Sequence, residues 1–493
     1  DPLYTASYIG ANGGLMMVVA DDPGLYSSQN EQDTRCVARA ALVPVLEPSD
    51  SQEAKDFVKE AYRISEEYDT PVILRTTTRL AHSQGPVVLE DRVEPEDKPY
   101  ERNPGKNVMM PGNAIKRHLH VEDRMNRLEK DGSDFAINKA EYNDTSIGFI
   151  TSGIPYQYVK EVFPQASVLK LGMVYPLPKK LIEEFAKKVD KLYIFEELEP
   201  VIEEQVKAWG IECIGKEIFT RQGEYSANLL REKVLGQNVE TKPYPNLPAR
   251  PPILCPGCPH RSTFTVLNKL KIHAAGDIGC YTLGAVAPLN VIDTTVCMGA
   301  SISMAHGAEK AKGRDFARKS LAIIGDSTFF HSGMTGLATA SYNKSNITVL
   351  IVDNSTTGMT GHQHNPTTGY NIKGDPAAKI DLETLCRALG IRRVRVVDPY
   401  DIQACEAAVK EELAADEPSV IISRRPCALL KYVKHNPPLR VDRDACKGCK
   451  ACMRLGCPAI SMKAGKAAVD ATLCVGCGVC QSLCAFDALK GDA

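Results

Sequence analysis

The sequence has no long hydrophobic run and no excess of charge of either sign. No stretch approaches the roughly 18 apolar residues that identify a membrane-spanning helix, so we expect no membrane association. Lysine and arginine number 59 against 61 aspartate and glutamate residues, for a formal net charge of −2. Nucleic-acid-binding proteins carry a clustered basic surface, so this balance argues against nucleic acid as a partner. The length of 493 residues corresponds to about three or four domains.

The sequence also shows no signal-like segment, no low-complexity stretch and no internal repeat apart from a doubled cysteine motif. Cysteine is abundant, with 17 residues. Disulfides form in oxidising compartments, whereas reactive thiols survive where the surroundings are reducing. We therefore expect a cytoplasmic location in a reducing, anaerobic setting.

Two cysteine runs near the C-terminal end are the most informative feature of the chain. The first is Cys446-x2-Cys449-x2-Cys452-x4-Cys457-Pro458, and the second is Cys474-x2-Cys477-x2-Cys480-x3-Cys484. Both follow the ligand pattern of two-cluster bacterial ferredoxins, in which each motif gives its fourth cysteine to the other motif's cluster. We predict that residues 438–493 form an α+β ferredoxin domain with two [4Fe–4S] clusters, one held by Cys446, Cys449, Cys452 and Cys484, the other by Cys474, Cys477, Cys480 and Cys457.

A zinc site and a disulfide framework are the alternatives for these cysteines. A four-cysteine zinc site does not need a third cysteine two residues beyond the first pair. The runs depart from the ferredoxin pattern at two points: four residues rather than three precede Cys457, and Ala485 stands where a proline often follows. A loop through Gly456 can accommodate the extra residue, so the prediction of an electron-transfer domain is unchanged.

Upstream of this tail, short apolar strands alternate with amphipathic helices, which is typical of α/β domains with parallel sheets. The first domain spans 1–90, with strand signals at 16–20 and 71–75 and a helix signal at 51–68 that Asp50 can cap. Charge and proline dominate 91–143, which we interpret as a linker or a surface excursion. A second α/β domain spans 144–240. A third spans 250–433, after a linker marked by Pro243, Pro245, Pro248, Pro251 and Pro252.

The first domain is expected to be incomplete at its N-terminal side. The chain begins with Asp1 rather than methionine, and the strand signal at 16–20 has nothing ahead of it to pair with. We expect about one hundred further residues before Asp1, in keeping with ordinary domain sizes.

Polar residues follow two strand signals of the third domain. The strand at 321–324 runs into Gly325-Asp326, and the strand at 349–352 runs into Asp353-Asn354. Neighbouring parallel strands bring their carboxyl ends together, so Asp326 and Asn354 can lie side by side. A carboxylate and an amide oxygen suit Mg2+, which binds hard oxygen ligands and can share a diphosphate with them.

This arrangement resembles the thiamine-diphosphate motif, which is usually Gly-Asp-Gly followed by Asn-Asn. The resemblance implies that the metal ligands are Asp326, Asn354 and the backbone carbonyl of Thr356. Ser327 and Asp353 replace the second glycine and the first asparagine, so the motif by itself is moderately specific.

Four cysteines on other loops form a second candidate set. Cys255 and Cys258 open the third domain, Cys280 follows 22 positions after Cys258, and Cys427 closes the domain. They could hold a third cluster, or they could be buried thiols, since free cysteine is commonly buried. The remaining cysteines do not follow the spacing of any ligand motif, and we interpret them as core residues: Cys36, Cys213, Cys297, Cys386 and Cys405. His331 and His362 are candidates for substrate contact.

Four longer segments carry a resemblance to one family. They are Cys-Pro-Gly-Cys-Pro-His-Arg (255–261), Gly-Asp-Ile-Gly-Cys-Tyr-Thr-Leu-Gly (276–284), Gly-Asp-Ser-Thr-Phe-Phe-His-Ser-Gly (325–333) and Asn-Ser-Thr-Thr-Gly-Met-Thr-Gly-His-Gln (354–363). With them the chain resembles the alpha subunits of the indolepyruvate ferredoxin oxidoreductase family, which belong to the 2-oxoacid:ferredoxin oxidoreductases. The resemblance extends from the segment 28–35 to the cysteine tail.

The resemblance implies pyrimidine-binding, transketolase-C-like, diphosphate-binding and ferredoxin domains in that order. It implies thiamine diphosphate, Mg2+ and, besides the two tail clusters, a proximal [4Fe–4S] cluster held by Cys255, Cys258, Cys280 and Cys427. It also implies a smaller beta subunit in a hetero-oligomer, and conversion of indole-3-pyruvate, CoA and oxidised ferredoxin to indoleacetyl-CoA, CO2 and reduced ferredoxin. The cofactor would be contacted by Asp277, Gly279, Cys280, Gly325, Asp326, Ser327, Asn354 and Thr356.

The family also has an activating glutamate near the beginning of its pyrimidine-binding domain, and no residue here matches that motif. Glu31 is the first place to look for a substitute. We therefore expect the 493-residue chain to be catalytically silent even with its partner, while its clusters still accept electrons from a chemical reductant.

Other function classes compete with this interpretation. A non-redox thiamine-diphosphate decarboxylase or synthase would not need the ferredoxin tail, and a pure electron-transfer subunit would not bind thiamine diphosphate. Within the favoured class, an aryl-glyoxylate or branched-chain 2-oxoacid enzyme is an alternative, because substrate size depends on pocket shape rather than on any motif.

Overall fold

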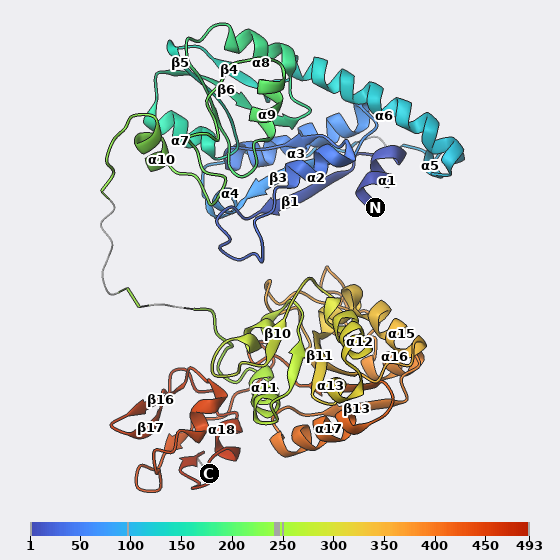
Figure 1. Cartoon of the computed structure of the whole chain (residues 1–493), viewed down its shortest axis with the longest axis vertical. Coiled ribbons are helices and arrows are strands. Elements are labelled where there is room, and N and C mark those ends of the chain that lie inside the picture. The colour runs from blue at the N-terminus through green and yellow to red at the C-terminus, as the bar shows by residue number, and fades with distance from the viewer. Residues whose placement is uncertain (1, 96–97, 241–246, 249–250, 492–493) are drawn as a thin grey trace. The chain divides into compact units, whose positions relative to one another are not determined.

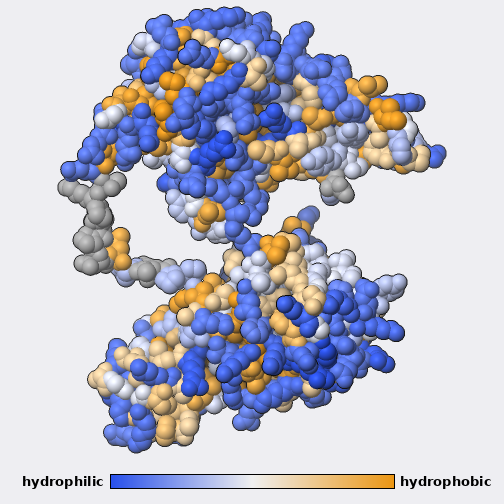
Figure 2. Space-filling view, in the orientation of Figure 1, coloured by the Kyte–Doolittle hydropathy of each residue, from blue (hydrophilic) through white to orange (hydrophobic). Residues whose placement is uncertain are grey.

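The computed structural model describes residues 2–95, 98–240, 247–248 and 251–491, and the chain forms two compact units, 1–245 and 246–493 (Figure 1). Asp1 and two prolines of the predicted linker, Pro243 and Pro245, lie outside the described residues. Polar side chains cover most of the visible surface of each unit (Figure 2). None of the described helices combines the length and the apolar character that crossing a membrane requires.

The first unit contains two four-stranded sheets of mostly parallel strands. The first sheet has the order β1-β3-β2-β7 and the second has the order β4-β6-β5-β8, with β7 and β4 antiparallel at their edges. The strands are β1 (Met16–Asp21), β2 (Val45–Leu46), β3 (Val72–Thr77), β4 (Lys139–Glu141), β5 (Asp144–Ser152), β6 (Ala166–Leu171), β7 (Met173–Tyr175) and β8 (Leu192–Phe195).

Helices surround these two sheets, and the helix predicted near residue 51 is confirmed. Helix α3 begins at Ser51, and the Asp50 carboxylate caps it by accepting from the Glu53 backbone N–H at 2.8 Å. The helices are α1 (Pro2–Ile9), α2 (Thr34–Ala41), α3 (Ser51–Glu67), α4 (Thr78–His82), α5 (Pro104–Asn107), α6 (Pro111–Asp131), α7 (Pro155–Val162), α8 (Lys179–Ala186), α9 (Val201–Ala208) and α10 (Ala227–Lys233).

The segments 1–90 and 144–240 share one hydrophobic core. Strand β7 comes from the second segment yet pairs with β2 of the first, with Val45 opposite Tyr175. The core joins Ile73 of β3 to Leu169 of β6 and Ile194 of β8. The sequence separates these segments, whereas the structure packs them together, because apolar faces of neighbouring sheets are buried against each other whatever their order in the chain.

The interpretation of 91–143 as a linker or a surface excursion is wrong for residues 111–131, which form α6, and for residues 139–141, which form β4 of the second sheet. Four of its residues are buried, and they recur at the three- and four-residue spacing of one helix face: Val121, Arg124, Met125 and Leu128. The buried Arg124 donates to Ser7 Oγ at 2.7 Å and to the Asp69 carbonyl at 2.8 Å. With so few buried apolar residues among the 21, the helix cannot be recognised from the hydrophobic pattern of a charged segment.

The second unit is built on a six-stranded parallel sheet with the order β10-β9-β11-β12-β14-β13. The two strands predicted around 321–324 and 349–352 are neighbours, with Ile323 opposite Leu350. Side chains of β11 alternate between two cores, Leu321 and Ile323 in one and Ala322 and Ile324 in the other. The strands are β9 (His273–Ala275), β10 (Ile292–Thr294), β11 (Ser320–Gly325), β12 (Thr348–Asp353), β13 (Arg393–Val397) and β14 (Ser419–Arg424).

Helices cover both faces of this sheet, as a parallel sheet requires. They include α11 (His260–Lys269), α12 (Ala300–Lys312), α13 (Arg314–Ala317), α14 (Asp326–Thr328), α15 (Met334–Tyr342), α16 (Leu382–Ala388) and α17 (Ile402–Ala414).

The C-terminal tail is a small structure packed on this domain. It contains two antiparallel strand pairs, β15 (Arg440–Val441) with β18 (Leu489–Lys490) and β16 (Ile460–Lys463) with β17 (Lys466–Val469), and the short helix α18 (Val479–Ser482). Its core combines aliphatic residues with the buried Cys446, Cys452 and Cys480, and Tyr400 and Ile402 of the neighbouring domain pack against it. So small a core needs further stabilisation, which bound clusters would supply.

Candidate active site and cysteine clusters

A pocket lies at the carboxyl ends of β11 and β12, where the sequence predicts the diphosphate site. Asp326 follows β11 and Asn354 follows β12, and both side chains are buried, with 2% and 7% exposed. The parallel pairing of the two strands brings these residues together at one edge of the sheet. The predicted residues Gly279, Cys280, Gly325, Asp326, Ser327, Asn354 and Thr356 all line this pocket.

Three oxygen-bearing groups meet in the pocket. The Asn354 amide turns one of its two polar atoms toward Asp326 Oδ1 at 3.3 Å and toward the Thr356 carbonyl oxygen at 2.6 Å. An NH2 group at that position donates to both oxygens and satisfies them without a cation. With the amide turned over, its oxygen would stand beside the other two oxygens, and a cation could bind all three. A hard cation such as Mg2+ therefore fits the donor set that the pocket presents.

The other carboxylate oxygen of Asp326 is held by neighbouring side chains. Asn365 Nδ2 donates to Oδ2 at 3.1 Å, and Thr367 Oγ1 donates to it at 3.2 Å. Burial, with a further contribution from the Asp353 carboxylate, raises the pKa of Asp326 to about 7. A cation beside the carboxylate would reverse this effect by favouring the charged form.

The tyrosine at position 281 explains why two of the predicted residues are glycines. A Cβ atom at Gly279 would lie 2.5 Å from the Tyr281 ring, and one at Gly325 would lie 2.7 Å from it. The buried ring therefore occupies the space that side chains at these positions would need.

Asp277 differs from the other predicted residues. It is fully buried, and its carboxylate accepts from the backbone N–H groups of Gly299 at 2.7 Å and Ser301 at 3.3 Å. It thus satisfies the N-terminus of α12, which begins at Ala300 just after the pocket residue Met298. Nothing in the sequence distinguishes a carboxylate that caps a distant helix from one that contacts a ligand.

Histidine 260 lines the pocket, and the sequence analysis missed it. Its ring packs edge-on against Tyr281, and burial lowers its pKa to about 4, so the imidazole is neutral. Its place in the Cys-Pro-Gly-Cys-Pro-His segment could have suggested it. Of the two histidines proposed for substrate contact, His362 lies with Nε2 3.8 Å from Cys427 Sγ, and His331 bonds to Ser332 Oγ at 2.9 Å.

The four cysteines of the third domain gather next to this pocket. The Cys427 backbone N–H donates to the Asn354 carbonyl at 2.9 Å, and Cys280 lines the pocket itself. Electrostatic interactions join Cys258 to Cys255 and Cys427, and Cys280 to the same two. Burial raises the pKa of Cys258, Cys280 and Cys427.

Three of the five cysteines predicted as core residues are buried: Cys213, Cys386 and Cys405. Cys36 and Cys297 are exposed, so the prediction is wrong for these two. Helix α2 buries Arg35, Ala38 and Ala41, which leaves Cys36 on its outer side.

The tail cysteines form two groups that cross between the sequence motifs. The first-motif residue Cys452 interacts with Cys446, Cys449 and also Cys484 of the second motif. Cys480 interacts with Cys474 and Cys477, with Cys457 of the first motif, and also with Cys452 of the other predicted set. Cys446, Cys449, Cys452 and Cys484 line one common cavity. The two predicted ligand sets stay a prediction, which these interactions and the common cavity support.

Within the described part of the chain, no three His, Cys, Asp or Glu side chains converge as the ligands of a single metal ion.

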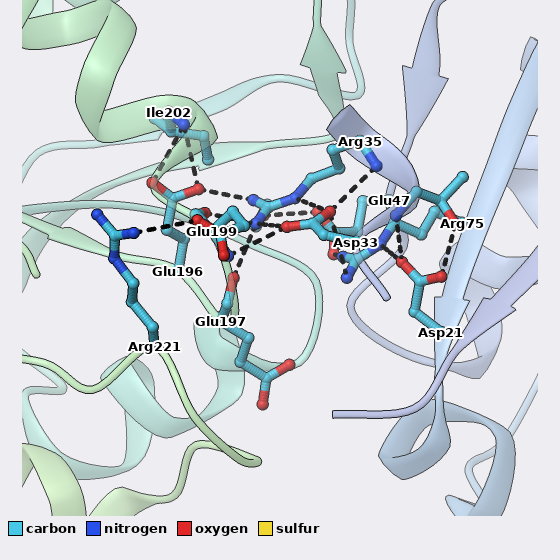
Figure 3. Close-up of polar contacts among 12 residues, drawn as sticks. Asp21, Asp33, Arg35, Glu47, Arg75, Glu196, Glu197, Glu199, Ile202 and Arg221 are labelled. Carbon is cyan, nitrogen blue, oxygen red and sulfur yellow. Dashed lines mark hydrogen bonds and ion pairs between the residues drawn. The ribbon is translucent and has the colours of Figure 1, made fainter. Parts of the chain in front are cut away.

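The first unit contains a separate network of buried charges centred on two arginines (Figure 3). Arg35 and Arg75 are each 1% exposed. Arg35 pairs with Asp33 at 2.7 Å and with Glu196 at 2.6 Å, and it donates to the Glu197 carbonyl at 2.7 Å. Arg35 lies on α2, and Glu196 follows β8 of the second sheet. This ion pair therefore joins the segment 1–90 to the segment 144–240.

The second arginine extends this network along the first sheet. Arg75 of β3 pairs with Asp21 at the end of β1 at 2.6 Å and with Glu47 after β2. Removing one member of such a network leaves an uncompensated buried charge, so these residues stabilise the unit as a set.

Glu31, the proposed substitute for the activating glutamate, holds two loops together. Its Oε1 accepts from the backbone N–H groups of Gly24 at 2.7 Å and Gly223 at 2.9 Å. These bonds give it a structural role within the first unit.

Replacing Glu197 by Gln should remove a pH dependence of stability. Burial raises the pKa of Glu197 from 4.5 to about 7, and Figure 3 shows its side chain pointing away from the two arginines. The folded protein therefore keeps a proton that the unfolded chain loses, so this contribution to stability is present below pH 4.5 and is lost as the pH rises through 7.

Urea unfolding of the two proteins at pH 5 and pH 8 measures this effect. We expect Glu197→Gln to be more stable than the wild type at pH 8, by up to about 3 kcal/mol, with a smaller difference at pH 5. Glu199→Gln, at an exposed neighbouring position, is the matched control. Parallel pH profiles of Glu197→Gln and the wild type would contradict the assignment.

Comparison with known proteins identifies the domain that contains this pocket. Residues 277–423 match the family described as "Thiamine pyrophosphate enzyme, C-terminal TPP binding domain". The chain is 42% identical to indolepyruvate oxidoreductase subunit IorA of Pyrococcus abyssi, 42% identical to that of Pyrococcus horikoshii and 39% identical to that of Thermococcus kodakarensis. Each similarity covers 99% of this chain and 84% of the relative. The chain therefore belongs to the family of indolepyruvate oxidoreductase subunits IorA, and it is an oxidoreductase subunit with a thiamine-pyrophosphate-binding domain.

Proposed function

We propose that this chain is the larger subunit of a 2-oxoacid:ferredoxin oxidoreductase that acts on indole-3-pyruvate. With CoA and oxidised ferredoxin, the enzyme would give indoleacetyl-CoA, CO2 and reduced ferredoxin. The observation that carries the proposal is that two cysteines adjoin the Asp326–Asn354 pocket. Cys280 lines the pocket, and the Cys427 backbone N–H donates to the Asn354 carbonyl. Cofactor chemistry at the pocket would thus be adjacent to an outlet for electrons.

The pocket residues fit a diphosphate and its metal. Asp326, Asn354 and the Thr356 carbonyl would hold Mg2+ at the wall of the pocket that they line. Thiamine diphosphate supplies carbanion stabilisation after loss of CO2 from a 2-oxoacid. The protein itself would bind and orient the cofactor and would exclude water from the buried Asp326 carboxylate.

Twelve cysteines would hold three [4Fe–4S] clusters. The proximal set is Cys255, Cys258, Cys280 and Cys427, and the two tail sets are those that cross between the motifs. The set next to the pocket would receive electrons first, and the tail sets would pass them outward one at a time.

Ferredoxin and a smaller subunit are the proposed protein partners, in a cytoplasmic hetero-oligomer. The relatives are named as subunits, which supports a partner chain. The exposed thiol-bearing residue Cys449 lies between the exposed Lys447 and Lys450, and Arg443 and Arg454 are exposed nearby in sequence. Exposed Asp442 and Asp444 lie in the same stretch, so basic residues outnumber acidic ones there only by four to two. A partner with an acidic surface would be favoured by this excess, and salt should weaken that encounter.

A panel of 2-oxoacids tests the proposed function on the native two-subunit enzyme. We expect ferredoxin reduction with indole-3-pyruvate to be CoA-dependent and faster than with aryl-glyoxylate or branched-chain 2-oxoacids. Faster turnover of one of these would move the assignment to that substrate class. Decarboxylation without ferredoxin reduction would favour a non-redox thiamine enzyme, and a preparation without thiamine diphosphate would favour an electron-transfer subunit.

Replacing Cys258 by Ala should remove one cluster and leave the other two. Cys258 interacts electrostatically with two other members of its set, so the cluster should lose a required ligand. Iron analysis should fall from about twelve to about eight irons per chain, on a stoichiometry of four irons per cluster. Cys386→Ala, at a buried cysteine outside the three sets, should keep all of its iron. Full iron content in Cys258→Ala would return this set to the buried-thiol interpretation.

A further inference from the structure

A buried arginine lies between the proximal cysteines and the tail. Arg261, at the beginning of α11, is 4% exposed. Its Nε donates to the Cys255 carbonyl at 3.0 Å. Its Nη1 donates to the carbonyls of Leu455, at 3.2 Å, and of Gly456, the two residues that precede Cys457. One side chain therefore bonds to the loops of two different cysteine sets.

The two cysteine loops also touch each other. A Cβ atom at Gly257, between Cys255 and Cys258, would lie 2.3 Å from a methyl group of Val475, which stands between Cys474 and Cys477. Tyr400 Oη donates to the Gly257 carbonyl at 2.5 Å on the same interface. The set of Cys457, Cys474, Cys477 and Cys480 is therefore the tail set that adjoins the proximal cysteines.

The surroundings of the Arg261 guanidinium contain no matching carboxylate among the described residues. The groups that act on its charge are Cys457, Cys258, Cys255 and Cys477. A guanidinium does not lose its proton in proteins, and a buried cation needs a counter-charge. Neutral thiols do not supply one, whereas the thiolates of bound clusters do.

A second feature of the guanidinium indicates the same partner. Arg261 Nη2 is buried and has no hydrogen-bond partner among the described residues. An unpaired buried donor is costly and is uncommon in folded proteins. A cluster sulfur or cysteine thiolate on either side would accept this hydrogen bond.

We propose that Arg261 is a positioning residue that links the proximal cluster to the adjoining tail cluster and favours the reduced state of both. The inference rests on the proposed function, because it requires both clusters. Each cluster gains one negative charge when it accepts an electron, and a fixed cation with a donor aimed at sulfur stabilises the more negative state. Arg261 itself is neither oxidised nor reduced. Its hydrogen bonds to Leu455 and Gly456 also hold the loop of Cys457 at the interface.

Redox titrations of the native two-subunit enzyme, followed by EPR, test the proposal. Dithionite-reduced wild-type enzyme must first show three clusters; if it does not, the proposed function fails regardless of Arg261. In Arg261→Gln we expect the one-electron reduction equilibrium of two clusters to shift at least tenfold toward the oxidised form, which corresponds to 59 mV. The third cluster, held by Cys446, Cys449, Cys452 and Cys484, should keep its potential.

Two further variants separate tuning from a merely structural role. Arg261→Lys keeps the charge without the forked donor, so its shifts should be smaller than those of Arg261→Gln. Arg314→Gln removes another arginine that donates to backbone carbonyls, at 3.1 Å to Asn346, and pairs with Asp416 instead of cysteines; it should leave all three potentials unchanged. Unchanged potentials in Arg261→Gln with full iron content would overturn the proposal. Loss of the adjoining cluster from both Arg261 variants would also overturn it, leaving Arg261 a structural residue.

Discussion

Replacing Asp326 by Ala should reduce the affinity for thiamine diphosphate by orders of magnitude. The substitution removes the only carboxylate of the proposed Mg2+ site, leaving an amide and a backbone carbonyl as its protein ligands. Divalent magnesium depends on carboxylate and phosphate oxygens, so the diphosphate would lose the metal that joins it to the protein. Thiamine diphosphate content after purification, and calorimetric titration with the cofactor and Mg2+, measure the loss.

The control for this variant is a buried carboxylate of the same domain that lies outside the pocket. Glu309 of α12 is 8% exposed and accepts from Ser345 Oγ at 3.0 Å, so Glu309→Gln should keep the cofactor. The three clusters should persist in Asp326→Ala, because no cluster ligand is changed. Unchanged cofactor content in Asp326→Ala would show that the diphosphate binds elsewhere.

Replacing Cys457 by Ala should destroy the cluster of the second cysteine motif. The cluster of the first motif, to which Cys457 belongs in sequence, should persist. Cys457 interacts with Cys477 and Cys480 of the second motif. Without its fourth thiolate that cluster should be lost or degraded, with a fall in iron content and loss of its EPR signal. The cluster of Cys446, Cys449, Cys452 and Cys484 should keep its signal.

The reciprocal variant makes this test specific. Cys484→Ala should remove the cluster of the first motif and preserve that of the second, because Cys484 interacts with Cys452. Cys405→Ala, at a buried cysteine whose Sγ lies 3.4 Å from the Asp398 carbonyl, should preserve all three clusters. Loss of the first-motif cluster in Cys457→Ala would mean that each motif ligates its own cluster.

The two predictions depend on different kinds of information in the sequence. The tail cysteines follow a short spacing in which one loop presents three ligands, so the motif itself indicates their chemistry. The Gly456 that follows the 3-10 turn Ala451–Leu455 has a φ of +64°, which accommodates the extra residue before Cys457 as expected. The strand ends at Asp326 and Asn354 could also be predicted, because an apolar run precedes each residue and a turn signal follows the run.

Contacts between distant segments could not be predicted from the sequence in this way. Nothing in the sequence pairs Arg261 with a carbonyl 194 positions away at Leu455, or Arg35 with Glu196, 161 positions away. Helix α6 was missed because its buried residues include an arginine, Arg124, whose burial becomes favourable only when Ser7 and Asp69 accept its hydrogen bonds.

The sequence by itself determined the features that depend on near neighbours: the cap of α3 by Asp50, the apolar strands, the glycine turns and the cysteine loops. Such features follow from local backbone geometry and from ligand spacing, which a few adjacent residues specify. Only the tertiary structure decided that Asp277 caps α12, that the two parts of the first unit share a core, and that Arg261 joins two cysteine sets. These outcomes depend on which surfaces are buried together, because burial makes an unpaired charge or donor costly and so selects the partner.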